Sequence, residues 1–581
     1  MVSLGCRGLL HGARGGWRSF RTPLRNVRRV SECRVVRACA SNQTNGSKRN
    51  PDKYVVTTPL YYVNAAPHMG SAYPTIAADA VARYQRLKGK DVSFITGTDE
   101  HGEKIALAAE SNGMEPQEHC DHIVSQYKAL WSELDIQYDS FIRTSSERHG
   151  AFVSEVLERV WERGDIYLDQ YEGWYCVDCE EYKDDGEMVD HCCSVHRKKC
   201  FFRKEENYFF RLSKYQKEIG ELVINNDKFI QPASRRNEVA GWVKDGLRDF
   251  SISRVNVDWG VRIREDPKHT VYVWFDALTG YLSGLFPPGE AASLDKVQER
   301  GWPADVHIIG KDILRFHAVY WPAMLLSAGL PVPDSIFGHG FITKDGLKMG
   351  KSLGNVLDPY ALVSAYGSDA VRYFFMQEFA FGQDGDFSEP RFRDVINSNL
   401  ANDIGNLLNR TLNLLKKNCN SACPVSSGDI SQDNPLRALA TMKVTEVATG
   451  YERFNFSAGL AGVLSISGRG NQYLEETAPW AAFKKGSNGE KAYAGQVLVS
   501  VLEAVRIVAV MLSPVTPRLA QRIYIQLGFS EQDYQNLTWS DAYWGVLRSG
   551  HQVRAPKPVF KRIDDDCAFV TKSSEEPVTV A

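Results

Sequence analysis

The chain has 581 residues, of which 43% are hydrophobic and 24% are charged, and this composition predicts several globular domains with an ample core. No apolar run is long enough to predict a membrane span, so we expect no membrane partner. The net charge of −2 is uneven, because residues 1–50 hold ten Arg and one Lys against a single acid, Glu32, which gives them +10 and leaves −12 for the rest of the chain.

Residues 1–50 predict a transit peptide and linker. They are rich in Arg, Ser and Gly and lack the continuous apolar core of a secretory signal. The segment Val35–Ser41 (VVRACAS) resembles a plastid processing site, whereas the arginine density suits mitochondria equally well. We therefore expect import into the chloroplast, the mitochondrion or both; a basic arm that binds RNA is the alternative.

A phosphate-handling signature follows the first predicted strand, YVVTTPLYY. Pro67–Ser71 (PHMGS) opens a predicted helix, whose unpaired N–H groups and positive dipole end favour an anion. Gly70 lets a phosphate approach the backbone, and His68 can donate a hydrogen bond to it. Pro74 lies in the first turn, where a missing N–H costs little. On its own this short match is more typical of a capping or packing histidine.

Five of the twelve cysteines fall between Cys176 and Cys200, which favours a metal site over disulfides. Cys176 and Cys179 form a CxxC, and Cys193 and His196 form a CxxH after thirteen intervening residues. These four ligands predict one structural zinc ion with no open position for chemistry. The spare thiols of Cys192 and Cys200 could replace a ligand, and chance clustering of cysteines is the alternative.

A second signature lies in the Gly-rich segment FITKDGLKMGKSLGN. Lys348 and Lys351 can swing onto a polyphosphate as mobile point charges. Strands and helices alternate from the first signature to the second, so we predict an α/β fold, a Rossmann-like doubly wound parallel sheet that binds its ligand at the carboxyl ends of the strands. The predicted halves are residues 51–169 and 256–354, and residues 170–255 form an insertion with the zinc knuckle.

With these motifs in this order, residues 54–563 resemble the class I aminoacyl-tRNA synthetases and, among them, the methionyl-tRNA synthetases. Two positions depart from the family pattern: Ser71 stands where a His is usual, and Gly350 where a Ser is usual. Both replacements are small and keep His68, Lys348 and Lys351, so we expect altered kinetics rather than lost activity. The shortness of the insertion favours methionine over amino acids whose synthetases carry a long editing insertion.

The resemblance implies that methionine attacks the α-phosphorus of ATP, with Mg²⁺ sharing the phosphate charge, and that a tRNA hydroxyl then takes methionine from the methionyl-adenylate. It implies catalytic roles for His68, Ser71, Lys348 and Lys351. It implies ATP contacts from His68, Gly70, Ser71, Asp312, Lys348 and Lys351. It places Asp99 on the substrate ammonium group, in a methionine site made of Leu60, Tyr62, Asp99, Trp274, Ala277, Tyr281, Ile313 and His317.

Beyond Asn355 the periodicity becomes helical, which predicts an α-helical bundle. We expect a stem-contact linker over residues 355–400, an anticodon-binding domain over 401–565 and a polar tail over 566–581. The resemblance implies that Asn406, Arg410 and Trp480 read the anticodon of tRNA(Met), since single-stranded RNA is read by stacking and edge hydrogen bonds. Few residues follow Ile563, and we expect a monomer.

Three other readings account for parts of the pattern. A different nucleotidyltransferase would share the two signatures but would not need the helical RNA-reading half. A non-catalytic protein that binds zinc and RNA would not need the lysine loop. A cysteine-activating relative would place its metal ligands around the substrate and not within one hairpin.

Overall fold

The computed structural model describes residues 50–177, 180–183, 185–194, 197–255, 257–287, 289–290, 292–344, 346–349 and 356–564. All of them belong to one compact unit. The predicted transit peptide and polar tail lie outside the described residues. So do four residues singled out above: Cys179, His196, Gly350 and Lys351.

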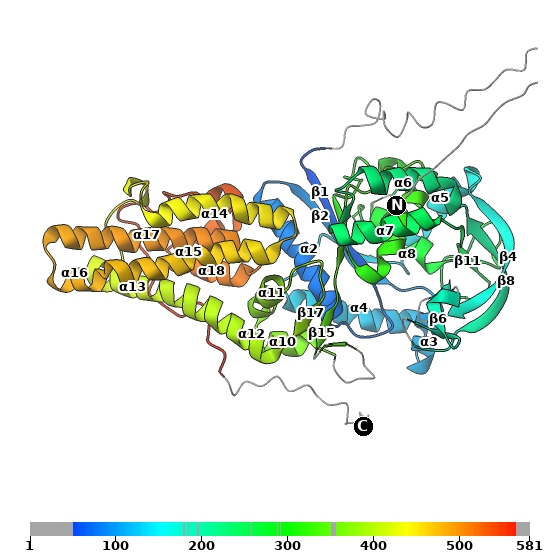
Figure 1. Ribbon diagram of the computed structural model, residues 1–581, viewed down its shortest axis with the longest axis horizontal. Helices are drawn as coiled ribbons and strands as arrows, with labels where there is room; N and C mark the ends of the chain where they lie inside the picture. The colour runs from blue at the N-terminus through cyan, green and yellow to red at the C-terminus, as the bar shows by residue number, and fades with distance from the viewer. Residues whose placement is uncertain are drawn as a thin grey trace, which may run out of the picture. The chain divides into compact units, whose positions relative to one another are not determined.

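A six-stranded sheet forms the centre of the first half of the chain (Figure 1). Every neighbouring pair in it is parallel. The strands, in spatial order, are β3 (Ser140–Arg143), β2 (Asp91–Asp99), β1 (Lys53–Tyr62), β13 (Val306–Gly310), β14 (Ile336–His339) and β9 (Ile230–Gln231). The predicted parallel sheet is thus confirmed. The edge strand β9 lies inside the stretch expected to be an insertion, so this part of the insertion contributes to the main sheet.

Helices cover both faces of this sheet, as the burial pattern of β1 shows. Val55 and Val56 are neighbours on the strand and are both fully buried, but they belong to separate hydrophobic cores because successive side chains point to opposite faces. Helix α2 (Met69–Leu87) packs in the core of Val56, and α8 (Val273–Ser283) in that of Val55. The other helices of this half are α3 (Glu103–Ser111), α4 (Pro116–Glu133), α5 (Glu147–Glu162), α6 (Gln216–Asn225), α7 (Ala233–Asp245) and α9 (Trp321–Ser327).

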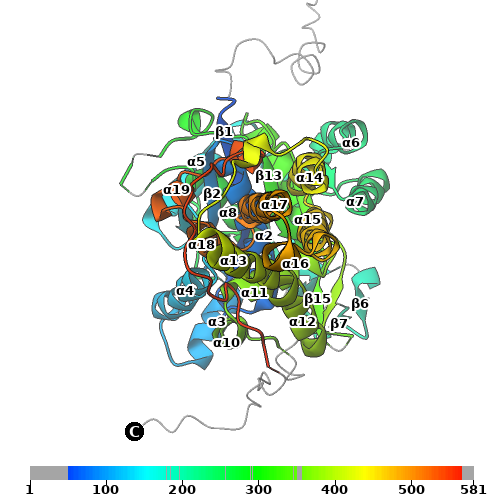
Figure 2. The same cartoon turned by 90° about the vertical axis from the view of Figure 1, so that its left-hand side faces the viewer.

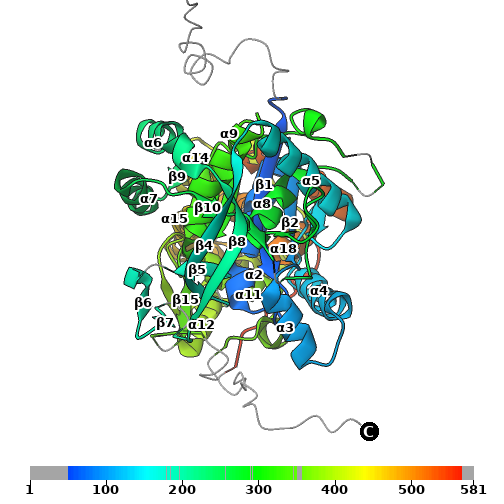
Figure 3. The same cartoon turned by 90° about the vertical axis from the view of Figure 1, so that its right-hand side faces the viewer.

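A second, antiparallel sheet lies at the end of the molecule away from the helical region (Figures 1 and 3). Its strands, in spatial order, are β10 (Phe250–Ser251), β8 (Phe201–Phe210), β4 (Ile166–Cys176) and β5 (Glu181–Lys183). Smaller pairings involve β6 (Met188–Val189) with β7 (Cys192–Cys193), β11 (Ser253–Arg254) with β12 (Thr270–Val271), and β15 (Ile342–Lys344) with β16 (Leu347–Lys348) and β17 (Gly385–Phe387). The cysteine hairpin is therefore attached to the tips of β4 and β8.

The last part of the chain is helical, as predicted. The apolar helix α17 lies in the middle of the bundle, with other helices around it (Figure 2). Among the described residues α17 is the one helix with the length and composition of a membrane span, but 94% of its apolar window is buried inside the protein. The helices are α10 (Pro359–Tyr366), α11 (Ser368–Gln377), α12 (Glu389–Ile396), α13 (Asn406–Cys419), α14 (Pro435–Glu452), α15 (Phe456–Thr477), α16 (Pro479–Lys485), α17 (Asn488–Leu512), α18 (Pro517–Gln526) and α19 (Glu531–Gln535).

Candidate active site

The first signature begins α2 as predicted, but the helix already starts at Met69, so Pro74 lies inside the helix and not in its first turn. His68 is the N-cap residue, and its Nδ1 accepts a hydrogen bond from the amide of Gly70 at 3.0 Å. Ser71 completes a capping box, because its Oγ accepts from the amide of His68 at 3.2 Å and donates to the carbonyl of His68 at 2.8 Å. A Cβ at Gly70 would approach the His68 ring to 2.6 Å, so only glycine lets the ring fold over the helix end. In this structure His68 and Ser71 serve as caps, and their contact with phosphate stays a prediction.

The structure brings the two signatures together. The amide of Met69, in the first signature, donates to the carbonyl of Leu357 at 3.4 Å, and the amide of Leu357 contacts Sδ of Met349 at 3.4 Å. Met349 is the second residue of the KMGKS motif, and Lys348 before it ends β16. The chain on both sides of the lysine loop is therefore anchored beside the N-terminus of α2.

Asp99 lies at the carboxyl end of β2, where a parallel sheet binds its ligand. The residue is only 2% exposed, and its Oδ1 has no hydrogen-bond partner among the described residues. Burial, together with the charges of Asp276, Glu180 and Glu100, raises the pKa of Asp99 well above its ordinary value. A buried carboxylate with an unsatisfied oxygen fits a cationic ligand, because a positive charge there would restore the ionised form.

Two histidines that were not predicted as site residues hold the carboxylate of Asp276, whose charge acts on Asp99. The buried carboxylate of Asp276 contacts Nδ1 of His101 and Nε2 of His149, each at 2.6 Å. Burial alone would raise the pKa of Asp276, but the two imidazoles outweigh it and hold the pKa at about 2. His101 belongs to the TGTDEHGEK motif, so the motif was a signal, but its partner on α8 is 175 residues away in the chain.

The residues predicted to bind methionine come together around Trp274. Its ring stacks on Phe316 at 3.9 Å between centroids and meets Tyr62 edge-on at 6.3 Å. Leu60, Tyr62 and Ile313 pack at the edge of this core, Ala277 is buried one turn after Trp274 on α8, and the indole Nε1 of Trp274 has no hydrogen-bond partner in the described chain. Phe316 was missed, although it directly precedes the predicted His317.

Tyr281 and His317 lie next to Trp274 in the same core and have a defined proton arrangement. Nδ1 of His317 lies 3.0 Å from the carbonyl of Ile313, which can only accept, so Nδ1 carries the proton. Nε2 then accepts from the hydroxyl of Tyr281 at 2.7 Å. Burial lowers the pKa of His317 to about 4, so the imidazole is neutral at physiological pH.

Asp312, the remaining predicted ATP residue, lies exposed in the turn after β13. A Cβ at Gly310 would clash with its carboxylate, so the glycine lets Asp312 fold back towards the strand end. The position is therefore at the ligand-binding edge of the sheet, as expected for a residue near the ribose or amino acid.

Two of the four predicted zinc ligands can be placed. Cys176, at the end of β4, and Cys193, in β7, are both 1% exposed and pack together with the buried Cys200 in one small cluster. Cys192 is half-buried and lies outside this cluster, which favours Cys193 over Cys192. The described cysteines form no disulfide with one another, and no group of three or more His, Cys, Asp or Glu among the described residues is arranged to hold a metal.

The predicted anticodon residues lie on α13 and α16 of the helical region, and α16 is at the end of that region away from α2 (Figure 1). Arg410, one turn after Asn406 on α13, lies over the ring of Trp480 at 5.7 Å from the centroid. The guanidinium also pairs with Glu475 of α15 at 2.5 Å, a partner that the sequence did not reveal. Trp480 is 38% exposed, so one of its faces remains available for stacking.

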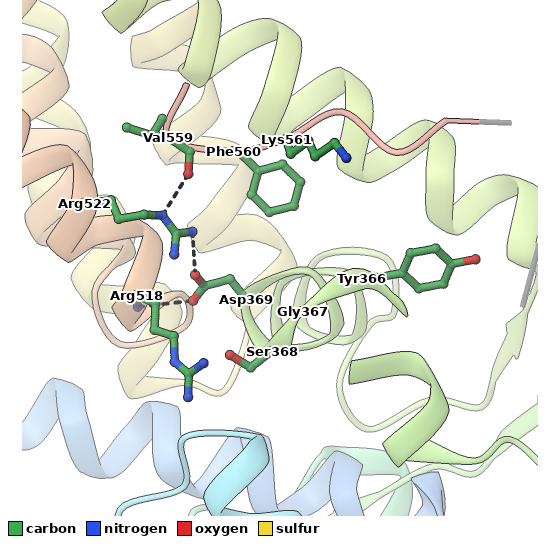
Figure 4. Close-up of a pocket in the computed structure, with 9 residues that line it drawn as sticks. All are labelled: Tyr366, Gly367, Ser368, Asp369, Arg518, Arg522, Val559, Phe560 and Lys561. Carbon is green, nitrogen blue, oxygen red and sulfur yellow. Dashed lines mark hydrogen bonds and ion pairs between the residues drawn. The ribbon is translucent and has the colours of Figure 1, made fainter. Parts of the chain in front are cut away.

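A cavity of about 320 Å³ lies elsewhere (Figure 4). It opens where the junction of α10 and α11 meets α18 and the segment 559–561, with Asp369 paired to Arg522 at 3.1 Å in its wall. None of the predicted site residues lines it. The candidate active site is thus defined by its side chains and not by this cavity.

Comparisons with known proteins cover nearly all of the described chain. Residues 54–196 and 184–412 match the family described as tRNA synthetases class I (M), and residues 424–572 match the anticodon binding domain of methionyl tRNA ligase. The chain is 54% identical over 527 residues to the chloroplastic/mitochondrial methionine–tRNA ligase of Arabidopsis thaliana, a match that covers 90% of this chain and 85% of the relative. It is also 54% identical over 518 residues to the methionine–tRNA ligase of a Nostoc species, covering 88% and 97%.

Among solved structures, the chain is similar to Mycobacterium tuberculosis methionyl-tRNA synthetase in complex with methionyl-adenylate. The TM-score is 0.83 at 40% sequence identity, and the match covers 88% of this chain and 100% of that chain.

Proposed function

Because the chain belongs to the methionyl-tRNA synthetases of class I, and therefore joins methionine to tRNA through a methionyl-adenylate, we propose how its own residues divide this reaction. The observation that carries the assignment is the unsatisfied oxygen of Asp99, which is buried at the carboxyl end of β2.

Methionine would lie with its ammonium group on Asp99 and its thioether against the aromatic residues. Trp274, stacked on Phe316, and Tyr62 offer the flat polarisable surface that a thioether favours. The neutral His317 accepts a hydrogen bond from the Tyr281 hydroxyl and fixes it. These two residues would therefore present no charge to the thioether methyl group of methionine. Charge at one end and apolar surface at the other would select the free amino acid in one orientation.

ATP would lie at the N-terminus of α2, with its phosphates reaching the lysine loop. The amides that follow His68 and the positive dipole end of α2 favour the triphosphate. Lys348 and Lys351 would follow the charge that develops on pyrophosphate, and Mg²⁺ would enter with ATP and share that charge. The methionine carboxylate is already ionised, so the residues mainly position the reactants and neutralise charge. Asp312 would contact the ribose or the amino acid.

The knuckle would hold one structural zinc ion through Cys176, Cys179, Cys193 and His196. The buried, unbridged thiols of Cys176 and Cys193 fit this role, because thiolates shielded from solvent suit zinc. Zinc there would supply stability and no chemistry.

Asn406, Arg410 and Trp480 would read the anticodon. The guanidinium of Arg410 over Trp480 offers one cationic and one aromatic plane to unstacked bases. We expect the protein to act as a monomer, which light scattering at several concentrations checks.

We also propose that the enzyme serves an organelle. The organellar name of the Arabidopsis relative and the arginine-rich residues 1–50 support this, although cyanobacterial relatives are equally similar. Fusion of residues 1–60 to a fluorescent reporter tests import. Fluorescence in plastids or mitochondria supports the proposal, and diffuse cytosolic fluorescence would favour the alternative of a basic RNA-binding arm.

The division of roles is tested by comparing two activities of the full chain. Lys351→Ala should depress both methionine-dependent ATP–pyrophosphate exchange and tRNA charging, because the lysine acts on the phosphates in the first step. By contrast, a variant of the anticodon residues should lose tRNA charging and keep ATP–pyrophosphate exchange. If Lys351→Ala leaves exchange intact, the assignment of the lysine loop is wrong.

A further inference from the structure

Glu180 connects the cysteine hairpin to the amino-acid site. It follows Cys179 in the sequence, yet its side chain is buried, with 2% exposure. Its backbone has a φ of 53°, a left-handed conformation that residues with a side chain seldom adopt. Its Oε1 accepts a hydrogen bond from the amide of Lys104 at 2.9 Å, at the start of α3. The hairpin thus turns this carboxylate inward, onto the turn that follows β2.

The carboxylate lies against the turn that follows Asp99 in the chain. A Cβ at Gly102, three residues after Asp99, would clash with both carboxylate oxygens of Glu180. The charge of Glu180 also adds to burial in raising the pKa of Asp99 and that of Tyr62, two residues predicted to bind methionine. Glu180 therefore borders the ammonium end of the pocket, although it comes from a different part of the chain.

Two acidic oxygens at this end of the pocket lack partners. Oε2 of Glu180 and Oδ1 of Asp99 are both buried without a hydrogen bond among the described residues. The other two acids whose charges act on Asp99 are satisfied, since Asp276 contacts two histidines and Glu100 accepts from Arg143 at 2.8 Å through each oxygen. Lys104 and Arg254 bring positive charge near Glu180. A primary ammonium group has three donors, which is more than one carboxylate oxygen uses.

We propose that Glu180 is a specificity-determining residue of the amino-acid site, a second carboxylate that binds the primary ammonium group of the substrate opposite Asp99. This inference rests on the proposed function and deepens it. It gives the zinc hairpin a role in substrate selection, because the residue that follows a predicted zinc ligand reaches the substrate.

Two competitive inhibitors of methionine-dependent exchange distinguish a contact between Glu180 and the amine from a general effect on the site. L-Methioninol keeps the amine, and 4-(methylthio)butan-1-ol lacks it. In Glu180→Gln the inhibition constant of methioninol should rise about tenfold, whereas that of the amine-free alcohol stays unchanged. The matched control is Glu181→Gln, whose carboxylate pairs with Lys183 at 2.8 Å, and it should change neither constant. Zinc content is measured in each protein to show that the hairpin is intact.

A second variant displaces Glu180 without changing it. Gly102→Ala places a methyl group against the carboxylate of Glu180. It should raise the inhibition constant of methioninol, as Glu180→Gln does. Gly113→Ala is its control, because Gly113 also has a positive φ, of 65°, but nothing lies within 4 Å of the added carbon. Equal inhibition constants for methioninol in Gly102→Ala and Gly113→Ala, or equal losses for both inhibitors in Glu180→Gln, would overturn the inference. Absence of methionine-dependent exchange in the unaltered protein would instead overturn the proposed function.

Discussion

The amide of Met69 donates to the carbonyl of Leu357 at 3.4 Å, across nearly 300 residues of chain. Met69 begins the helix of the first phosphate signature, and Leu357 follows the lysine loop of the second. The contact makes one site from two motifs, so a change at either motif should affect the same chemical step.

Gly70→Ala tests the helix end of this site. The added methyl group would approach the His68 ring to 2.6 Å and force it off the cap. We expect kcat for ATP–pyrophosphate exchange to fall by at least about tenfold, a barrier increase of about 1.4 kcal/mol, while the KM for methionine changes little.

The matched control for that variant is Gly241→Ala in α7, where nothing lies within 4 Å of the new carbon. It should retain full exchange. Unchanged kcat in Gly70→Ala would show that the position of the His68 ring does not matter for catalysis.

Asp99→Asn should raise the KM for methionine far more than the KM for ATP. Loss of a charge-assisted hydrogen bond of about 1.5–3 kcal/mol predicts roughly ten- to hundredfold weaker methionine binding. Exchange kinetics with each substrate varied in turn measure the two effects. Asp91→Asn, at the exposed start of the same strand, is the control and should change neither KM. Equal effects of Asp99→Asn on both substrates would refute its assignment to the ammonium group.

His317 predicts an acid-dependent loss of stability. Its pKa is lowered to about 4 in the folded protein, whereas an unfolded histidine titrates near about 6.5, so only the unfolded chain takes up this proton between these values. The contribution of neutral His317 to the free energy of unfolding is therefore complete above a pH of about 6.5. It is lost as the pH falls towards about 4, which lowers the free energy of unfolding by up to about 3 kcal/mol.

Urea unfolding at several pH values measures this linkage. His317→Gln can keep a hydrogen bond to Tyr281 but cannot titrate, so its free energy of unfolding should fall less steeply between pH of about 6.5 and about 4. Parallel slopes for both proteins would contradict the buried neutral imidazole.

Zinc content distinguishes the neighbouring thiols of the hairpin. Cys193→Ser should lose bound zinc and lower the melting temperature, because Cys193 is buried beside Cys176. Cys192→Ser should keep the metal, since Cys192 lies outside this cluster. The reverse result would place Cys192 in the ligand set, and retention of zinc by both variants would point to Cys200 as a replacement ligand.

Trp480→Ala should impair tRNA charging while leaving exchange intact, because Trp480 lies on the helical bundle, remote in the fold from α2. Loss of a base–aromatic stack worth about 1–3 kcal/mol predicts that kcat/KM for tRNA falls by roughly five- to hundredfold. Tyr543→Ala, an exposed aromatic residue of the same region, is the control. Loss of both activities in Trp480→Ala would indicate a folding role.

The sequence predicted the features that follow from local patterns in the chain. The start of α2, the parallel sheet and the helical region beyond Asn355 follow from caps, alternation and periodicity. The partners of Asp276, the stack of Phe316 on Trp274 and the inward turn of Glu180 did not, because each joins side chains that meet only after the chain has folded. Family resemblance supplied the roles of Asp99 and Trp274, whereas the structure supplied the unsatisfied oxygens that make a second carboxylate contact testable.

The most direct test is to incubate the purified full chain with ATP, Mg²⁺ and one amino acid at a time, without tRNA, and to detect the acyl-adenylate by mass spectrometry. We expect methionyl-adenylate and pyrophosphate with methionine, and no adenylate with leucine, isoleucine, valine or cysteine. Absence of methionyl-adenylate from zinc-loaded protein would contradict the proposed function.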